Sequence, residues 1–330
     1  MRSITPIAVL VLAMFTGCEN GAPWPPGHQE TAAEPRRDFG PSAAYERRLV
    51  YLGPGPELPT AAVFDFSALT DSTGVRRALR ARLFDGQGWT SLVDQSWRME
   101  RMRDPWRIVP HGDLSMIVGD AGELGALVHR GEPVVRLAPG SHLAEASPGA
   151  GTQLVLREAM LLAGDSTGSG LLLDAQVGRP TTGMTSSAPD DTSHARLAWP
   201  GTEALLVSNG YQIVLSTSPV GDIGWVRQEE YDRIHRGVGL QPAGGAAPAG
   251  GSLPTGFRIG GPATTLTGEL TVETATFDPS GGDPSGGDPS GGPSGDPGGA
   301  PPDVGYFLVS GWVEEGGVRR DVFGLVRHVW

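Results

Sequence analysis

Turn signals recur so often along this chain that long, uninterrupted helices have little room between them. The 330 residues include 50 glycines and 29 prolines, about twice the usual share. Short apolar runs such as Leu114–Val118 and Gln153–Leu162 lie between the turns. Turns at intervals of about 8–12 residues favour an all-β protein, an antiparallel sandwich or barrel. The segment Gly74–Leu83 stays ambiguous, because its pattern fits either a strand or the start of a helix.

Two hairpins are predicted from their turn residues. Asn-Gly and Gly-Gly pairs supply the positive φ angles that tight hairpin turns need. Each such pair here lies between two runs rich in apolar and β-branched residues. The predicted hairpins join Glu203–Ser208 to Tyr211–Thr217 through Asn209-Gly210, and Tyr306–Val313 to Val318–Val329 through Glu314-Glu315-Gly316-Gly317.

The first residues look like an export signal. The apolar run Ile4–Phe15 is too short to span a bilayer as a helix, but its length fits the apolar core of a signal peptide. Phe15-Thr16-Gly17-Cys18 follows, and it contains the sole cysteine of the chain. This tetrapeptide resembles the lipobox of bacterial lipoproteins, although Phe15 replaces the usual leucine.

The lipoprotein resemblance implies a location and a modification. Residues 1–17 would be removed, and Cys18 would be acylated, for example with palmitate, to become the first residue of the mature chain. Glu19, in a position where aspartate would retain the protein at the inner membrane, implies outer-membrane sorting in a bacterium with two membranes. The protein would then be lipid-anchored in the cell envelope, facing the periplasm or the cell surface.

Composition divides the remaining chain into segments. A disordered tether is expected over residues 18–44, rich in proline and polar residues. A first β domain over 45–178 and a second over 197–330 are separated by a linker, 179–196. Within the second domain, residues 278–303 repeat Asp-Pro-Ser-Gly-Gly and predict a disordered loop between two strands.

Several chemistries are excluded or unsupported. The chain has 25 basic and 37 acidic residues, which argues against nucleic acid as a partner. No lysine is present, so Schiff-base and Walker-type lysines are excluded. One cysteine permits no internal disulfide, and none of the seven histidines has the spacing of a local metal pair. We predict neither a metal nor a cofactor.

Aromatic and sulfur-containing residues gather in the first half of the chain. Trp97, Met99, Trp106 and Met116 are candidate ligand-binding residues, because tryptophan and methionine can line an apolar cavity in a barrel. They can equally fill a core. Among the acidic residues, Asp65 and Asp71 are expected to flank the end of a strand, where solvated turn carboxylates are the ordinary interpretation.

The end of the chain carries a second resemblance. The segments Tyr306–Trp312 and Asp321–His328 are similar to the closing strands of lipocalin-like two-barrel bacterial proteins related to carotenoid hydratases. The resemblance implies a paired barrel that holds an apolar ligand. It transfers no catalytic residue to this sequence.

Three functions remain open at this point. The sequence favours a non-catalytic envelope protein that binds an apolar ligand or an envelope partner. The second function is an envelope hydrolase or hydratase that uses Asp or Glu with His, which would place His111 or His235 beside a carboxylate in a pocket. The third is a structural or adhesion module. The oligomeric state is left open.

Overall fold

The computed structural model describes residues 43–330, except for a set of internal segments. Those segments are 55–59, 72–73, 100–113, 118–124, 130–131, 147–151, 164–165, 181–200, 219–220, 230, 245–252, 263 and 279–303. The predicted signal peptide, Cys18, nearly all of the tether and loop, and most of the linker therefore lie outside the described residues. No helix within the described ranges is long and apolar enough to cross a membrane.

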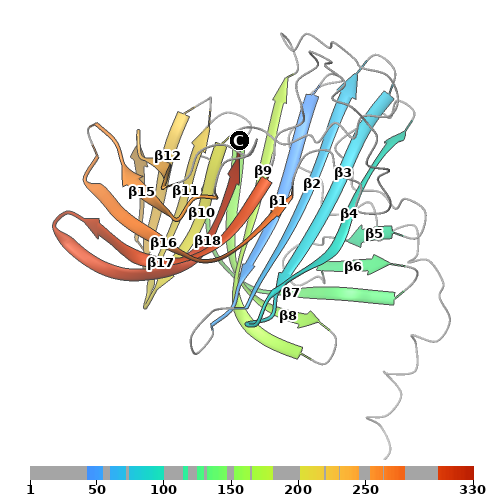
Figure 1. Ribbon diagram of the computed structural model, residues 1–330, viewed down its shortest axis with the longest axis horizontal. Coiled ribbons are helices and arrows are strands. Elements are labelled where there is room, and N and C mark those ends of the chain that lie inside the picture. Colours follow the sequence, from blue (N-terminus) through green and yellow to red (C-terminus); the bar gives the residue numbers. More distant parts are fainter. Residues whose placement is uncertain are drawn as a thin grey trace, which may run out of the picture.

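The protein is built from two curled antiparallel sheets, which confirms the predicted all-β class (Figure 1). The first sheet contains β1 (Ala43–Leu52), β2 (Ala61–Asp71), β3 (Gly74–Phe84), β4 (Trp89–Met99), β5 (Leu114–Ile117), β6 (Gly125–His129), β7 (Glu132–Ala146), β8 (Thr152–Ala163) and β9 (Ser166–Pro180). The second contains β10 (Gly201–Ser208), β11 (Tyr211–Ser218), β12 (Gly221–Gln228), β13 (Tyr231–Arg236), β14 (Gly239–Ala243), β15 (Gly256–Gly260), β16 (Leu266–Asp278), β17 (Val304–Glu315) and β18 (Val318–Val329).

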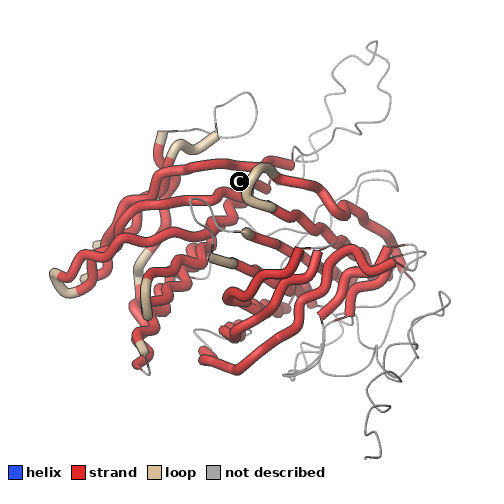
Figure 2. Tube along the Cα trace, turned by 90° about the horizontal axis from the view of Figure 1, so that it is seen from below, coloured by secondary structure: helices blue, strands red, loops and turns tan. Residues whose placement is uncertain are grey.

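The two sheets share one topology. The strand order is β4-β3-β2-β1-β9-β8-β7-β6-β5 in the first and β13-β12-β11-β10-β18-β17-β16-β15-β14 in the second. In each, the first strand pairs with the last, so that β1 lies beside β9 and β10 beside β18. Each sheet curls around its own interior (Figure 2). The protein thus consists of two half-barrels of identical connectivity.

The turn chemistry explains the hairpins that the sequence predicts. Gly210, Gly316 and Gly317 have φ angles of 67°, 58° and 82°, a region that glycine adopts without steric cost. The hairpins β10–β11 and β17–β18 are confirmed. The ambiguous segment from Gly74 is strand β3, because it pairs along its length with β2 on one side and β4 on the other.

Three apolar cores follow from the alternation of side chains along the strands. In β1, Leu49 and Tyr51 face the interior of the first half-barrel, whereas Val50 and Leu52 face the second half-barrel. That middle core also contains Leu205 and Leu308 from the second half-barrel, whose interior has a core of its own. The central strands are therefore buried on both faces, and the halves pack against each other through a shared apolar layer.

Candidate functional site

The described structure does not test the predicted apolar ligand residues as a group. Trp97 lies on β4 opposite Arg77 and packs against the core of the first half-barrel. Met99 ends β4 and Met116 lies on β5, but their side chains are outside the description, as is the whole of Trp106. The ligand-binding role of these four residues stays a prediction.

One of the two predicted histidines does lie beside a carboxylate. His111 is outside the described residues, but His235 Nε2 is 2.8 Å from Glu315 Oε1. Arg233 and the Tyr211 hydroxyl also donate to Glu315 Oε2, at 2.6 and 3.0 Å. Burial, followed by the bond to Glu315, raises the pKa of the Tyr211 hydroxyl above its ordinary value. This group ties the edge strand β13 to the end of β17 inside the second half-barrel.

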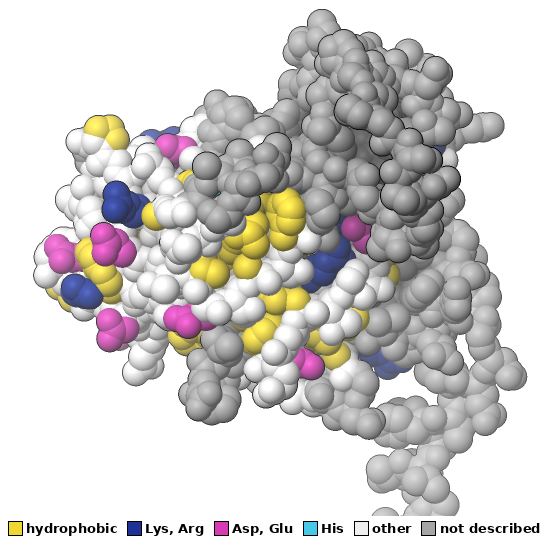
Figure 3. All heavy atoms as spheres, viewed as in Figure 1, with side chains coloured by type: hydrophobic (Ala, Val, Ile, Leu, Met, Phe, Trp, Pro, Cys, Tyr) yellow, Lys and Arg dark blue, Asp and Glu magenta, His cyan; other side chains and the backbone are white. Residues whose placement is uncertain are grey.

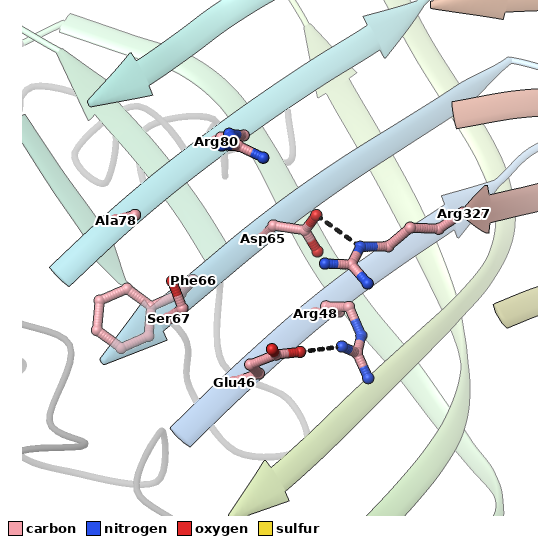
Figure 4. A pocket seen from close by; sticks show the side chains of 8 residues that line it. All are labelled: Glu46, Arg48, Asp65, Phe66, Ser67, Ala78, Arg80 and Arg327. Atoms are coloured by element: carbon pink, nitrogen blue, oxygen red, sulfur yellow. Dashed lines mark hydrogen bonds and ion pairs between the residues drawn. The ribbon is translucent and has the colours of Figure 1, made fainter. Parts of the chain in front are cut away.

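A charged hollow lies where the two half-barrels meet (Figure 4). It has room for little more than a water molecule. Strands of the first half-barrel supply most of its lining, and the last strand of the second supplies an arginine. The lining residues are Glu46, Arg48, Asp65, Phe66, Ser67, Ala78, Arg80 and Arg327.

Strand alternation places these charges at the junction. Along β1, Glu46 and Arg48 point the same way as Val50 and Leu52 of the shared core, and Asp65 follows Ala61 and Val63 on β2. The face of β1 and β2 that points toward the second half-barrel therefore carries apolar residues at one end and charged residues further along. Asp65 is therefore in the middle of β2 and not at a strand end, so the interpretation of Asp65 as a solvated turn carboxylate is wrong.

Asp65 is held by the second half-barrel. Its Oδ2 atom accepts a hydrogen bond from Arg327 Nε at 3.0 Å and another from the Tyr306 hydroxyl. Burial alone would raise the pKa of the Asp65 carboxyl, but the charges of Arg327 and Arg48 and the bond from Tyr306 hold it below its ordinary value. The carboxylate is consequently ionised at neutral pH. Its Oδ1 atom is buried and has no hydrogen-bond partner.

Glu46 has the opposite electrostatic environment. Arg48 bridges Glu46 and Glu203, and so links β1 to β10 across the junction. Burial raises the pKa of the Glu46 carboxyl by more than Arg48 and Arg327 lower it, and the charges of Glu203 and Asp65 add to the rise. Glu46 therefore retains a proton more readily than an exposed glutamate does.

The hollow thus joins two carboxyl groups whose pKa values are displaced in opposite directions. Such a pair can divide the roles of acid and base. Asp65 Oδ1 lacks a donor, and Arg48 Nε, also buried, lacks an acceptor. Buried polar groups of this kind are usually satisfied by ordered water. Asp65 Oδ1 therefore offers an unused acceptor to a water molecule in a hollow of that size.

The sequence contains a weak signal of this site. Glu46-Arg47-Arg48 interrupts an otherwise apolar strand. Three consecutive charged residues can be interpreted as members of buried ion pairs only when both faces of β1 are known to be covered, and the sequence alone does not show this. Arg47 faces the other way and forms its own pair with Asp174, at 2.6 Å. Sequence reasoning missed Glu46, Arg48 and Arg327.

Comparison with known proteins supports the fold. The sequence matches no known protein family and no curated protein. An ATTH-type protein of Nitrosomonas europaea is 12% identical, with a TM-score of 0.52, covering 93% of this chain and 99% of that one. CghA is 11% identical over 88% of both chains, with a TM-score of 0.46. Kievitone hydratase from Nectria haematococca is 10% identical over 88% of this chain and 89% of that one, with a TM-score of 0.44.

The likeness to the Nitrosomonas europaea protein shows the architecture and nothing about activity. The neighbour from Nitrosomonas europaea spans both half-barrels. The predicted similarity to lipocalin-like two-barrel proteins is confirmed at the level of the fold.

Proposed function

We propose that the protein catalyses the addition of water to a small substrate, or its hydrolysis, with the attacking water held in the hollow between the half-barrels. One observation carries the proposal. Two carboxyl groups line the same hollow, and the pKa of Glu46 is raised whereas that of Asp65 is lowered. Perturbed pairs of this kind are a mark of acid–base sites.

Each group has a defined role in the proposed reaction. Asp65 Oδ1 takes a proton from the water molecule, whose oxygen attacks the substrate. The protonated form of Glu46, which burial favours, gives its proton to the substrate, either to the second carbon of a polarised double bond or to a leaving group. The proton on Asp65 then passes through solvent to Glu46, which restores both groups. Arg327 and Tyr306 hold Oδ2 and leave Oδ1 for the water.

The charged lining is the reason for preferring this function to a non-catalytic apolar-ligand protein. Five of the eight lining residues are charged, and the buried Asp65 Oδ1 and Arg48 Nε atoms have no hydrogen-bond partner. An apolar ligand would leave both atoms unsatisfied, which is costly. In the described part of the chain, each half-barrel has an apolar core of its own. A hydrolase or hydratase fits this polar hollow better, with two carboxyl groups in place of the carboxylate–histidine pair that the sequence analysis expected.

We further propose that the enzyme works at a membrane surface. The lipobox-like Phe15-Thr16-Gly17-Cys18 supports lipid attachment at Cys18. Two or more acyl chains would hold the protein stably, and the 24 residues between Cys18 and Ala43 would let the half-barrels stand away from the bilayer. The outer membrane, facing either side, is the expected location in a bacterium with two membranes.

The proposal is tested by following oxygen from water into product. The chain is incubated in ¹⁸O-labelled water with small p-nitrophenyl esters and with enones, and products are analysed by mass spectrometry. Asp65→Asn and Glu46→Gln should each lower kcat/KM about 10²–10⁴-fold, the range typical of general acid–base groups. Glu269→Gln, an exposed position on β16, is the control. Equal rates for the wild type and Asp65→Asn, or no turnover in either, would contradict the proposal.

A further inference from the structure

Strand β13 forms one edge of the second sheet. It pairs with β12 over Ile223–Gln228, and no other strand in the described part of the chain pairs with it. An edge strand presents unpaired N–H and C=O groups to solvent, which makes it a template for another strand. The side chains of β13 are also exposed, with Tyr231 at 73% and Ile234 at 47% of their full accessible area.

The two faces of β13 differ in chemistry. Arg233 and His235 point into the half-barrel, where both contact Glu315. The opposite face, on the side of Trp225, carries Asp232, Ile234 and Arg236. An apolar residue on this outer face is therefore flanked at equal spacing by an acid and a base.

We propose that β13 pairs with β13 of a second copy of this chain, in an antiparallel arrangement whose two-fold axis passes through Ile234. In that register Ile234 lies opposite itself, and Asp232 lies opposite Arg236 of the partner copy on both sides of the axis. Apolar and opposite-charge cross-strand pairs stabilise a sheet. On the inner face Arg233 lies opposite His235, and each is already bound by a Glu315 carboxylate.

Other registers lose this complementarity. An axis through Arg233 would place that arginine opposite itself, and Asp232 opposite Ile234. An axis through Asp232 or Arg236 would place like charges face to face, which destabilises a sheet. The sequence of the outer face thus selects the axis at Ile234 and a second copy as the occupant.

The axis makes a direct cross-linking test possible. Residues directly opposite in an antiparallel pair have Cα atoms about 4.5–5.5 Å apart, within the range for a disulfide. Full-length Ile234→Cys should form a covalent dimer under mild oxidation, seen on a non-reducing gel. Arg236→Cys is the control, because that residue faces Asp232 and not itself. The parent chain, which has only Cys18, controls for linkage through that residue.

Charge exchange in the Ile234→Cys background tests the register. Asp232→Arg or Arg236→Asp alone should lower the dimer yield at least severalfold, because each places like charges opposite each other. Mixing the two variants should restore the yield, because the introduced arginine of one chain then faces the introduced aspartate of the other. The absence of a dimer from Ile234→Cys, an equal yield from Arg236→Cys, or no recovery on mixing would overturn the proposal.

Discussion

At the residue scale, His328 shows how burial sets the charge of a side chain. The ring lies between Phe257 and Trp330 in the second half-barrel, with Nδ1 2.7 Å from the Thr202 hydroxyl. Burial, followed by the charge of Arg327, lowers the pKa of His328 to about 4. The imidazole is therefore neutral at pH 7 and packs as an aromatic ring.

This shift predicts a loss of stability in mild acid. The unfolded chain takes up the His328 proton near pH 6.5, whereas the folded chain resists it until about pH 4, so the free energy of unfolding falls as the pH drops through that window. His328→Asn, which can keep the bond to Thr202, should flatten this part of the pH profile by about 2 kcal/mol. Urea unfolding at pH 7 and pH 4.5 gives the free energy of unfolding of each protein at both pH values. An equal fall in this free energy between the two pH values in both proteins would contradict the prediction.

A second prediction at this scale concerns Tyr306. Its hydroxyl donates to Asp65 and is buried among the junction charges. Tyr306→Phe leaves the apolar packing in place but removes one donor, so the pKa of Asp65 should rise. The stability that Asp65 contributes is present above its unfolded pKa and is lost as the pH falls through its folded pKa. The variant should therefore lose about 1.5–3 kcal/mol of stability at pH 7, the usual size of a hydrogen bond to a charged group. This loss should shrink as the pH falls and Asp65 becomes protonated. Urea unfolding at pH 7 and pH 3 measures both values, and an equal loss at the two pH values would contradict the prediction.

At the scale of elements, close approach of strands depends on particular glycines. A Cβ added at Gly324 of β18 would lie 2.1 Å from Leu205 O and 2.8 Å from Leu206 Cα of β10. Both are main-chain atoms of the strand that closes the second sheet, so neither can move cheaply. Gly324→Ala should cost about 1–3 kcal/mol of stability, as overpacking does.

Gly260 provides the matched control for this substitution. It ends β15, has open space where a Cβ would be, and does not need a positive φ. Gly260→Ala should therefore be neutral or slightly stabilising. Thermal unfolding of the two variants beside the wild type tests the contrast, and equal midpoints would show that β10 and β18 are not packed as described.

Elements also show where prediction from sequence succeeds. The hairpins at Asn209-Gly210 and Gly316-Gly317 join strands that are adjacent in the sequence, so their turn residues are enough to predict them. The pairing of β1 with β9 is not local, since Arg47 and Asp174 are 127 positions apart. The pattern of apolar and polar residues in β1 or β9 does not indicate which strand it pairs with. The strand character of the chain was predictable, but the order of strands was not.

At the scale of the whole molecule, the candidate site exists because the halves meet. Asp65 and Arg327 are 262 positions apart, and each belongs to a different sheet. Figure 3 shows one face of the molecule, where charged side chains are scattered around apolar ones. The charged residues of the hollow lie on strands that are covered on both faces. Composition and residue spacing do not show which strands are covered in this way, so they could not predict that these residues form a site.

A further prediction at this scale concerns the membrane anchor. If Cys18 is acylated, labelled palmitate should enter the protein in a bacterial host and the chain should sediment with membranes. Cys18→Ser should remove the label and release the chain, with the half-barrels still folded. Label in Cys18→Ser equal to that in the wild type would contradict anchoring at this residue.

The most direct test of the account is a titration of the two junction carboxyl groups. Carbon-13 NMR of the side-chain carboxyls, assigned with Glu46→Gln and Asp65→Asn, follows each group through the acid range. Glu46 should titrate above its ordinary pKa of 4.5, and Asp65 below its ordinary pKa of 3.8. Ordinary values for both groups, or shifts in the same direction, would contradict the division into acid and base.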